Sequence, residues 1–290
     1  MVTTAEGRVR VSVVGLGAWG TALAIHCARQ GHDVVAWHRD PTRARELNTG
    51  GKLRVAAASF PKPENIRVTS ELSECGGADL AIVALPASAW HDVVPALAAK
   101  ALISATKGLE KTSGLTPLQY AHERLGRATD SLCVISGPSF ASDVAVGTPV
   151  SLTAGSASDV TSQRVAQLLS GQTLRVYTSD DPRGVELGGI LKNIVAIAVG
   201  ISDGLAYGPS TRAALITRGL AEITRVAMAL GAKSQTLYGL SGLGDLVMTS
   251  TDDQSRNRTV GLRLGRGEKL DEIIASLGAT AEGVSSAPLV

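Results

Sequence analysis

A glycine-rich turn near the N-terminus constrains this 290-residue chain more than any other feature. The valine-rich run 11–14 leads directly into Gly15, Gly17 and Gly20 at G-x-G-x-x-G spacing, and a helical pattern follows. Gly15 permits a tight strand-to-helix turn, Gly17 lets the backbone approach a pyrophosphate, and Gly20 allows the helix to pack close to the strand. The helix N-terminus also offers unpaired N–H groups to an anion. The sequence therefore predicts a dinucleotide-binding turn.

The end of the second predicted strand indicates which dinucleotide binds. NAD-selective sites place a carboxylate there, about 20 residues after the glycine turn, to bind the ribose 2′-OH. This chain has His38, Arg39 and Asp40 at that place. The guanidinium of Arg39 can pair with a 2′-phosphate, which favours NADP(H), whereas Asp40 leaves NAD(H) open. The alternative is that His38 and Arg39 are ordinary solvated residues.

The chain divides by pattern into two unequal halves, with a boundary near residues 179–183. In the first half, short β-branched runs alternate with helical stretches, which is typical of a mostly parallel sheet covered on both faces. After Pro182 the strand runs disappear, and helical patterns are separated by glycine-rich turns. The fold class is therefore α/β: a doubly wound, Rossmann-type dinucleotide-binding domain over residues 1–181, followed by an all-α substrate domain over residues 182–290.

Periodicity also predicts the individual elements. The expected strands cover residues 8–14, 33–37, 79–85, 101–105, 132–136, 149–154 and 174–177. The expected helices cover residues 19–30, 42–48, 89–98, 117–125, 158–169, 184–205, 211–230, 237–240, 259–264 and 270–277. The chain stops at Val290 without a predicted closing helix, so we expect that C-terminal residues are missing.

Composition argues against several classes of partner. The 28 Lys and Arg nearly balance the 26 Asp and Glu, and aromatic residues are few, which disfavours nucleic acid. The three cysteines form no C-x-x-C pair, which disfavours disulfides and metal and favours the reducing cytoplasm. The most hydrophobic stretch, 188–205, contains Lys192, Asn193 and Asp203. It therefore indicates a buried helix rather than a membrane span.

Lysine is the leading candidate for acid–base chemistry, because all five histidines lie in the first half. A nicotinamide enzyme of this architecture usually binds its substrate between the cofactor and the second domain. Lys192 lies in a helix that is apolar on nearly every side, and burial would lower its pKa toward neutrality. A lysine whose head reaches water is the equally weighted alternative.

Two polar stretches of the second half complete the candidate set. Asp245 lies in a glycine-rich turn, where an aspartate often binds only its own backbone. Ser255, Arg256 and Asn257 combine a hydroxyl, a guanidinium and an amide at the start of a predicted helix. This combination suits a phosphate, whereas a helix cap with surface arginines is the alternative.

Together, the motifs resemble the bacterial NAD(P)-dependent glycerol-3-phosphate dehydrogenase family. The matching strings, in the family's order, are residues 15–24, 105–110, 136–141, 184–189, 191–193, 215–220, 242–246 and 255–258. The resemblance implies reversible reduction of dihydroxyacetone phosphate to sn-glycerol 3-phosphate with NAD(P)H and no metal, which supplies the backbone of phospholipids. We also expect a homodimer. The chain ends some tens of residues before family members usually do.

The resemblance further implies roles for individual residues. Lys192 would donate and accept the proton, and Asp245 would hold the substrate and help to set the protonation of Lys192. The residues expected to bind the substrate are Lys107, Gly137, Ser139, Ser255, Arg256 and Asn257. The residues expected to bind the cofactor are Gly15, Gly17, Ala18, Trp19, Gly20, His38, Arg39, Lys107, Ala141, Arg256, Thr280 and Glu282.

Two positions depart from the family pattern. Ala18 stands where serine is common, and residues 280–283 stand where a Val-Val-Glu-Gly type string is usual. These departures affect the expected affinity more than the expected activity. Two rival functions stay open: a β-hydroxyacid dehydrogenase-like NADP enzyme that acts on a carboxylate, and a non-catalytic NADP sensor.

Overall fold

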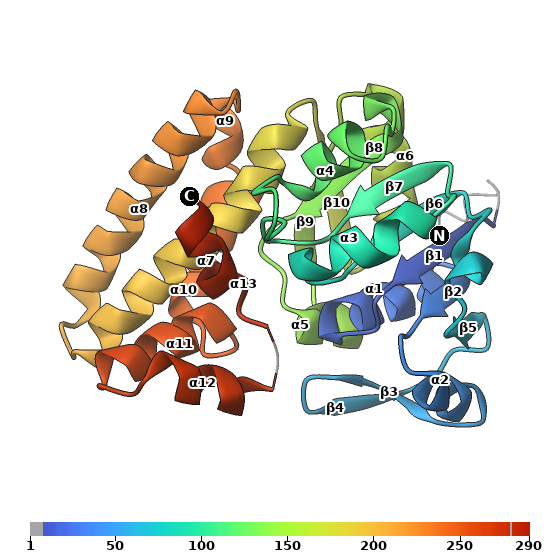
Figure 1. The fold of residues 1–290 in the computed structure, drawn as a ribbon, viewed down its shortest axis with the longest axis horizontal. Helices are drawn as coiled ribbons and strands as arrows, with labels where there is room; N and C mark the ends of the chain where they lie inside the picture. The colour runs from blue at the N-terminus through green and yellow to red at the C-terminus, as the bar shows by residue number, and fades with distance from the viewer. Residues whose placement is uncertain (1–7, 279) are drawn as a thin grey trace.

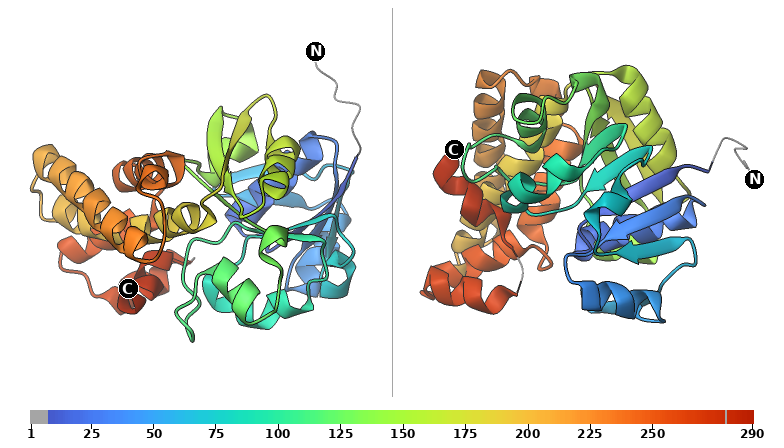
Figure 2. Two further views of the ribbon diagram at one scale, coloured as in Figure 1. Left: turned by 90° about the horizontal axis from the view of Figure 1, so that it is seen from above. Right: turned by 45° about the vertical axis from the view of Figure 1, so that its right-hand side comes forward.

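The computed structural model describes residues 8–278 and 280–290. Figure 1 shows a sheet-containing half beside a helical half, and the two turned views of Figure 2 show the same separation. Helix α7 (Pro182–Gly204) begins the helical half and packs against strands β8 (Leu132–Ser136) and β9 (Val150–Gly155) of the sheet. The helical half is therefore anchored directly on the sheet.

The central sheet has eight strands in the order β10-β9-β8-β7-β6-β1-β2-β5. Neighbouring strands are parallel except β8 and β9, which are antiparallel. Strand β1 lies between β2 and β6, so Val11 pairs with Val34 on one side and Leu80 on the other. The direction of winding changes at β1, where ligands of such sheets bind. The remaining strands are β1 (Arg10–Val14), β2 (Asp33–Trp37), β5 (Ile66–Thr69), β6 (Leu80–Val83), β7 (Ala101–Ser104) and β10 (Leu174–Ser179).

Helices cover both faces of this sheet. One face packs against apolar side chains of α1 (Ala18–Arg29), α2 (Pro41–Asn48), α5 (Ala141–Val146) and α6 (Asp159–Leu169). The other face packs against α3 (Trp90–Val93) and α4 (Pro117–Glu123). Every residue of β1 after Arg10 is buried, and the one polar side chain among them, Ser12, donates to the carbonyl oxygen of Cys75 at 2.9 Å. The described part of this half, which starts at residue 8, also contains 3-10 turns at Leu72–Cys75, Ala87–Ala89, Val94–Ala96 and Thr129–Ser131.

Capping side chains followed by proline fix the start of three helices. Asp40 caps α2, Thr116 caps α4 and Asp181 caps α7, and a proline follows each cap. Each capping oxygen accepts a backbone N–H that the first helical turn leaves unpaired, and proline needs no such partner. The sequence thus encodes where each of these helices begins.

Helix α7 is the centre of the helical half. It contacts α8, α10, α11 and α13, and it is long and apolar enough to span a membrane by length and composition. However, 72% of its apolar stretch is buried inside the protein, which is the environment of a core helix. The other elements of this half are α8 (Pro209–Ala229), α9 (Ser234–Leu237), the π-helical turn Leu240–Gly244, α10 (Asp245–Thr251), α11 (Arg256–Gly265), α12 (Leu270–Leu277), α13 (Glu282–Ser286) and the 3-10 turn Ala287–Leu289.

Glycines let α7 and α11 approach each other at backbone distance. A Cβ on Gly261 would overlap the carbonyl oxygen of Ile197, and a Cβ on Gly200 would overlap that of Arg258. One helical turn further along each helix, Gly204 and Gly265 are crowded in the same way. Only glycine fits at these crossings, because any side chain would meet the main chain of the neighbouring helix.

The predicted fold class, an α/β sheet followed by an all-helical region, is confirmed. Three strands were not predicted. Strands β3 (Lys52–Val55) and β4 (Ala58–Pro61) form a separate antiparallel hairpin, and β5 extends the main sheet beside β2. Each is only four residues long, which is too short for a clear periodic signal.

Several helix predictions were wrong in detail. The single helix expected at 89–98 is broken into 3-10 turns and the four-residue α3, because Pro95 lies inside it. The helix expected at 237–240 does not form, since α9 ends at Leu237 and the π-helical turn starts at Leu240. The short helix α13 near the C-terminus was also missed, so the expectation of no closing helix was wrong.

We expect Gly261→Ala to lower the free energy of unfolding by about 1–3 kcal/mol, the usual range for overpacking. Alanine normally stabilises a helix by roughly 0.5–1 kcal/mol relative to glycine, so steric overlap with α7 must outweigh this gain. Urea-induced unfolding followed by circular dichroism measures the difference. Arg266→Ala is the control, because this exposed residue directly follows the same helix as its C-cap. Equal stability of Gly261→Ala and the unaltered protein would contradict this account of the crossing.

Candidate active site

The turn between β1 and α1 has the geometry of a phosphate-binding loop. Gly15 has φ +105°, and a Cβ there would lie 2.8 Å from the carbonyl oxygen of Ala84. A Cβ on Gly20 would overlap the Gly15 carbonyl oxygen, whereas nothing lies within 4 Å of the position that a Cβ on Gly17 would take. The first and third glycines are therefore required by close packing, and the second leaves the backbone open to a ligand.

The first turn of α1 has hydrogen-bond donors without an acceptor among the described residues. Gly17 precedes the helix and provides no side-chain cap, and Ala18 contributes no hydroxyl. The buried indole Nε1 of Trp19 has no hydrogen-bond partner within residues 8–278 and 280–290. An uncapped helix N-terminus favours an anion, and an unpaired buried donor calls for an acceptor. These residues fit the pyrophosphate of a dinucleotide.

At the end of β2, the carboxylate of Asp40 already makes hydrogen bonds within the protein. The Asp40 carboxylate accepts hydrogen bonds from the backbone N–H of Thr42 at 2.9 Å and of Arg43, so it serves as the cap of α2. His38 Nδ1 lies 3.1 Å from the backbone N–H of Asp40 and accepts it. Arg39 is exposed and has no side-chain partner among the described residues. Of these three side chains, only Arg39 is uncommitted.

Three ionisable side chains meet at the start of the helical half. Lys192 Nζ, on α7, donates to Asp245 Oδ1 and to Thr249 Oγ1, the latter at 2.6 Å. Lys107 Nζ, from the loop after β7, donates to the other oxygen of Asp245 at 2.6 Å and to the Gly137 carbonyl oxygen at 3.4 Å. The Lys192 side chain is 5% exposed and Asp245 is fully buried, whereas Lys107 is 19% exposed. The structure thus brings four predicted residues together.

Burial and charge set the protonation of this cluster. Burial lowers the pKa of Lys192 to about 7, and the neighbouring ammonium of Lys107 acts in the same direction, against the attraction of Asp245. Burial alone would raise the pKa of Asp245, but Lys107 and Lys192 outweigh it and hold this pKa below its ordinary value. Asp245 is therefore ionised near neutrality, while Lys192 can take up or release a proton there.

The position of Asp245 depends on the π-helical turn before it. A Cβ on Gly188 of α7 would lie 2.7 Å from the Ser241 carbonyl oxygen, so glycine lets this turn rest on α7. Asp245 is the first residue of α10 and not part of a simple turn, which corrects the sequence prediction. Thr249 lies one helical turn later and faces the same lysine. It was missed, although its i, i+4 spacing from Asp245 was the available signal.

The predicted phosphate-binding residues lie at the N-terminus of α11. Ser255 caps this helix through its Oγ, which accepts the backbone N–H of Arg258 at 3.2 Å. Arg256 is exposed, and among the described residues its guanidinium has no hydrogen-bond partner. Ser139 lies elsewhere, beside Gly137, whose carbonyl oxygen accepts its hydroxyl at 3.3 Å.

A buried charge network that was not predicted holds α11 in place. Arg258 donates to Asp203 at the C-terminal end of α7, through Nε at 3.0 Å and Nη2 at 2.7 Å. Asp203 also accepts from Arg212 of α8 at 2.9 Å. The sequence signal was the arginine two residues after Arg256; surface arginines were the alternative for this stretch, whereas the Arg258 side chain is only 10% exposed.

The last predicted cofactor residues have different surroundings. Glu282 accepts the backbone N–H of Ala87 at 3.2 Å, which joins α13 to the loop after β6, and burial raises the pKa of its carboxyl. Thr280 is exposed, and Ala141 is the partly buried first residue of α5. Among the described residues, neither Thr280 nor Ala141 is a hydrogen-bond partner of the Lys192 cluster.

Strand direction explains how distant segments share one site. The glycine turn, Arg39, Ala87, Lys107 and Gly137 follow β1, β2, β6, β7 and β8 respectively, and these strands are all parallel. Their carboxyl ends therefore lie along one edge of the sheet, where ligands bind in such folds. Helix α7 brings Lys192 to this edge.

A second buried acid of α7 was also missed. The Glu186 carboxylate accepts the backbone N–H of Leu118 at 2.9 Å, at the first turn of α4. Burial raises the pKa of Glu186 to about 7. It therefore ties the helical half to the end of the loop that carries Lys107. The sequence feature that could have revealed Glu186 is its position as an acidic residue among the apolar residues of α7.

Family models for the two halves match most of the chain. A model described as NAD-dependent glycerol-3-phosphate dehydrogenase N-terminus matches residues 10–162, and its C-terminus counterpart matches residues 181–290. The chain belongs to the NAD-dependent glycerol-3-phosphate dehydrogenase family. The resemblance found in the sequence motifs is thereby confirmed.

Individual members of the glycerol-3-phosphate dehydrogenase family are similar over nearly the whole chain. The glycerol-3-phosphate dehydrogenase (NAD(P)+) of Thioalkalivibrio sulfidiphilus is 47% identical over 288 residues, which cover 96% of this chain and 85% of that protein. The corresponding protein of Pseudoalteromonas translucida is 43% identical over 94% of this chain and 83% of its own. A crystal structure of glycerol-3-phosphate dehydrogenase from Coxiella burnetii has a TM-score of 0.90 at 40% identity, covering 97% of this chain and 88% of that one.

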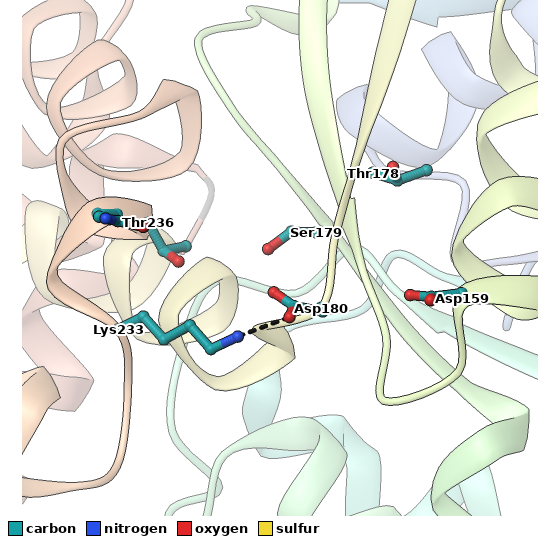
Figure 3. Close-up of a pocket in the computed structure, with 7 residues that line it drawn as sticks. Asp159, Thr178, Ser179, Asp180, Lys233 and Thr236 are labelled. Atoms are coloured by element: carbon teal, nitrogen blue, oxygen red, sulfur yellow. Dashed lines mark hydrogen bonds and ion pairs between the residues drawn. The ribbon is translucent and has the colours of Figure 1, made fainter.

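Another cleft lies between β10 and α9, away from the residues predicted to bind the substrate or the cofactor. Figure 3 shows its polar lining, which includes Asp159, Thr178 and Ser179, and the pairing of Lys233 with Asp180 at 2.6 Å. None of the residues predicted to bind substrate or cofactor lines it. In addition, no cluster of His, Cys, Asp or Glu within residues 8–278 and 280–290 is placed to hold a metal ion.

We expect Asp245→Asn to destabilise this glycerol-3-phosphate dehydrogenase family member by about 3–5 kcal/mol at pH 6, because Lys192 loses the counter-ion that lets it keep its proton in a buried site. The difference in free energy of unfolding between this variant and the unaltered protein should be smaller at pH 9. Without Asp245, the folded-state pKa of Lys192 falls further below 7 while the unfolded value stays near 10.5, so the folded variant has already lost this proton at pH 6. At pH 9 the amine is neutral in both folded proteins.

Urea unfolding at the two pH values measures this difference. Asp180→Asn is the matched control, since it breaks an exposed pair with Lys233 and should change stability little at either pH. A loss for Asp245→Asn that is the same at pH 6 and pH 9 would contradict the proposed protonation of Lys192.

Proposed function

We propose that this protein reversibly reduces dihydroxyacetone phosphate to sn-glycerol 3-phosphate with a nicotinamide dinucleotide, using Lys192 as the proton donor and acceptor. The observation that carries the proposal is the buried contact of Lys192 with Asp245 at the sheet edge that also holds the glycine turn. A buried lysine with a pKa near neutrality suits acid–base work. Membership of the glycerol-3-phosphate dehydrogenase family agrees with it.

The bound nicotinamide supplies the hydride that reaches the ketone carbon. As negative charge builds on the ketone oxygen, the Lys192 ammonium stabilises it and gives up a proton, so the product is a secondary alcohol. Asp245 and Thr249 hold the ammonium in one orientation, and Lys107 shares the same carboxylate. In the reverse direction, the neutral amine of Lys192 accepts the proton of the hydroxyl.

The phosphate of the substrate fits the N-terminus of α11. Arg256 is an exposed residue whose guanidinium makes no hydrogen bond with the described residues, and the backbone N–H groups of Arg256 and Asn257 donate to no residue in the described ranges. These donors and the helix dipole favour a dianion. Since the phosphate is remote from the ketone carbon, its binding energy orients the ketone toward Lys192 and the cofactor.

We further propose that NADP(H) is the preferred cofactor. Asp40 is engaged as the cap of α2, so its carboxylate is not available to a ribose 2′-OH, whereas Arg39 is exposed and without a side-chain partner in the described chain. A free guanidinium beside the expected ribose favours a 2′-phosphate.

The rival functions make different demands on the same residues. A dehydrogenase acting on a β-hydroxyacid would share the lysine but needs no phosphate site at α11. A non-catalytic NADP sensor has no use for a buried lysine with a pKa near 7. The uncommitted Arg256 and the Lys192 cluster together favour the phosphorylated ketone.

We also propose where the protein is located, which pathway it supplies and how many subunits it has. The cytoplasm suits three cysteines, Cys27, Cys75 and Cys133, that are buried and unpaired. A role in phospholipid supply follows from the product, and a homodimer is expected.

Addition of dihydroxyacetone phosphate should oxidise NADPH, as followed by absorbance at the nicotinamide band, and a panel of β-hydroxyacids with NADP+ should give no comparable rate. Lys192→Ala should lower kcat by about 10²–10⁴-fold, because proton transfer loses its donor. Cofactor binding, measured by calorimetry, should persist, since Lys192 does not touch the glycine turn.

The control is Lys100→Ala, which removes an exposed lysine paired with Asp79 and should leave kcat unchanged. Near-normal kcat in Lys192→Ala would remove this lysine from the mechanism. Reaction with the hydroxyacids alone would favour the rival enzyme.

Arg39→Ala should raise the KM for NADPH by about tenfold, the usual effect of losing one charge-assisted contact, and leave the KM for NADH nearly unchanged. Steady-state rates measured with NADPH and with NADH give the change in each KM. Arg43→Ala is the control, because Arg43 is engaged with Glu46. Equal changes for the two cofactors would show that Arg39 does not bind a 2′-phosphate.

A further inference from the structure

A buried asparagine beside the lysine connects both halves of the cleft. Asn193 directly follows Lys192 on α7 and is 5% exposed. Its Nδ2 donates to the carbonyl oxygen of Lys107 at 3.0 Å, and its Oδ1 accepts from Asn257 Nδ2 at 2.9 Å. One side chain therefore holds the backbone that carries Lys107 and also the second residue of α11.

A second amide extends this connection. Asn257 is 8% exposed, and its Oδ1 accepts the backbone N–H of Gly283 at 3.0 Å. The preceding residue, Glu282, accepts the backbone N–H of Ala87 after β6. The hydrogen bonds thus run from the loop after β7, through α7, α11 and α13, and back to the loop after β6. We call Asn193 and Asn257 the amide relay.

The partners fix the orientation of both amides. Asn193 Nδ2 faces two carbonyl oxygens, those of Lys107 and Gly189, so it must be the donor end. Asn257 Oδ1 faces a backbone N–H, so it must be the acceptor end. An asparagine is required at both places because each side chain donates at one end and accepts at the other.

Close packing prevents the relay from loosening. A Cβ on Gly283 would lie 2.7 Å from the Asn193 carbonyl oxygen and 2.8 Å from Asn257 Oδ1, and a Cβ on Gly108 would overlap the Glu282 carboxylate. The segments joined by the relay are therefore pressed together at backbone distance. A shift of α11 at the phosphate-binding end must move Asn257, then Asn193, and then the main chain of Lys107.

We infer that Asn193 is a positioning residue that couples the phosphate-binding N-terminus of α11 to the Lys107–Asp245–Lys192 cluster. This inference rests on the proposed function. Asn193 positions the main chain of Lys107 through one hydrogen bond and Asn257 of α11 through another. A phosphate bound at α11 therefore also positions the lysine cluster relative to the ketone of the substrate. Substrates without a phosphate do not benefit from this coupling.

The test compares dihydroxyacetone phosphate with dihydroxyacetone, which has the same ketone and no phosphate. Asn193→Ala should lower kcat/KM for dihydroxyacetone phosphate by about 10–100-fold, as expected for a small misplacement of the reacting groups. The kcat/KM for dihydroxyacetone should fall by much less. Asn257→Ala breaks the same bond from its other side and should shift the ratio between the two substrates in the same direction.

A double-mutant cycle strengthens the comparison. If the two asparagines act as one relay, Asn193→Ala with Asn257→Ala should lose little more than the worse single variant. The control is Asn48→Ala, since Asn48 also binds backbone with both ends of its amide, donating to and accepting from Val68, but on α2. It should leave the substrate ratio unchanged even if it lowers stability.

The outcomes separate the two proposals. Equal losses for both substrates, or losses that add in the double variant, would overturn the relay. If Asn193→Ala does not fold, the substrate ratio of Asn193→Ser decides instead, because serine is too short to make either bond of the asparagine amide. No reduction of dihydroxyacetone phosphate by the unaltered protein would overturn the proposed function and the relay with it, whereas a normal rate with an unchanged ratio in the variants overturns only the relay.

Discussion

The backbone contact between α7 and α11 is the constraint on which the rest of the structure depends. Helix α7 carries Lys192 and Asn193, and α11 starts with the residues suited to a phosphate. Glycines on both helices remove the side chains that would hold them apart, and Arg258 bound to Asp203 fixes their relative position along the axes. Without this contact, the two groups of residues would have no defined spacing, and Asn193 of α7 could not bind Asn257 of α11.

Electrostatics depends on the same packing. Lys192 and Asp245 are taken out of water, which would be costly for either charge alone, and their mutual contact with Lys107 offsets the cost. Burial in α7 lowers the pKa of Lys192 into a useful range, while the ammonium groups of Lys107 and Lys192 keep the Asp245 carboxylate ionised against the effect of its own burial. A more exposed lysine would stay protonated at neutral pH and could not exchange its proton as readily.

Much of this arrangement could be predicted from the sequence, and the failures have physical causes. The glycine turn has a local signature, because each glycine has a steric reason that acts within one strand and one helix. The separation into a sheet and a helical region follows from periodicity. Thr249, Arg258 and Glu186 were not recognised, because their roles depend on contacts between elements that are distant in the chain. The paired glycines at 200, 204, 261 and 265 were visible as two G-x-x-x-G strings, but the string alone does not say which helices meet. Short strands such as β3 and β4 owe their form to pairing with each other rather than to propensity.

The two lysines that share one aspartate make the pocket's net charge depend on a single proton. With Lys192 protonated, two cations face one anion, and the excess positive charge attracts a phosphate dianion. In the proposed reaction, transfer of this proton to the substrate oxygen leaves the charges of Lys107 and Asp245 to cancel, so the attraction for the product weakens. The side chain proposed to complete the reduction would then also promote release of the product.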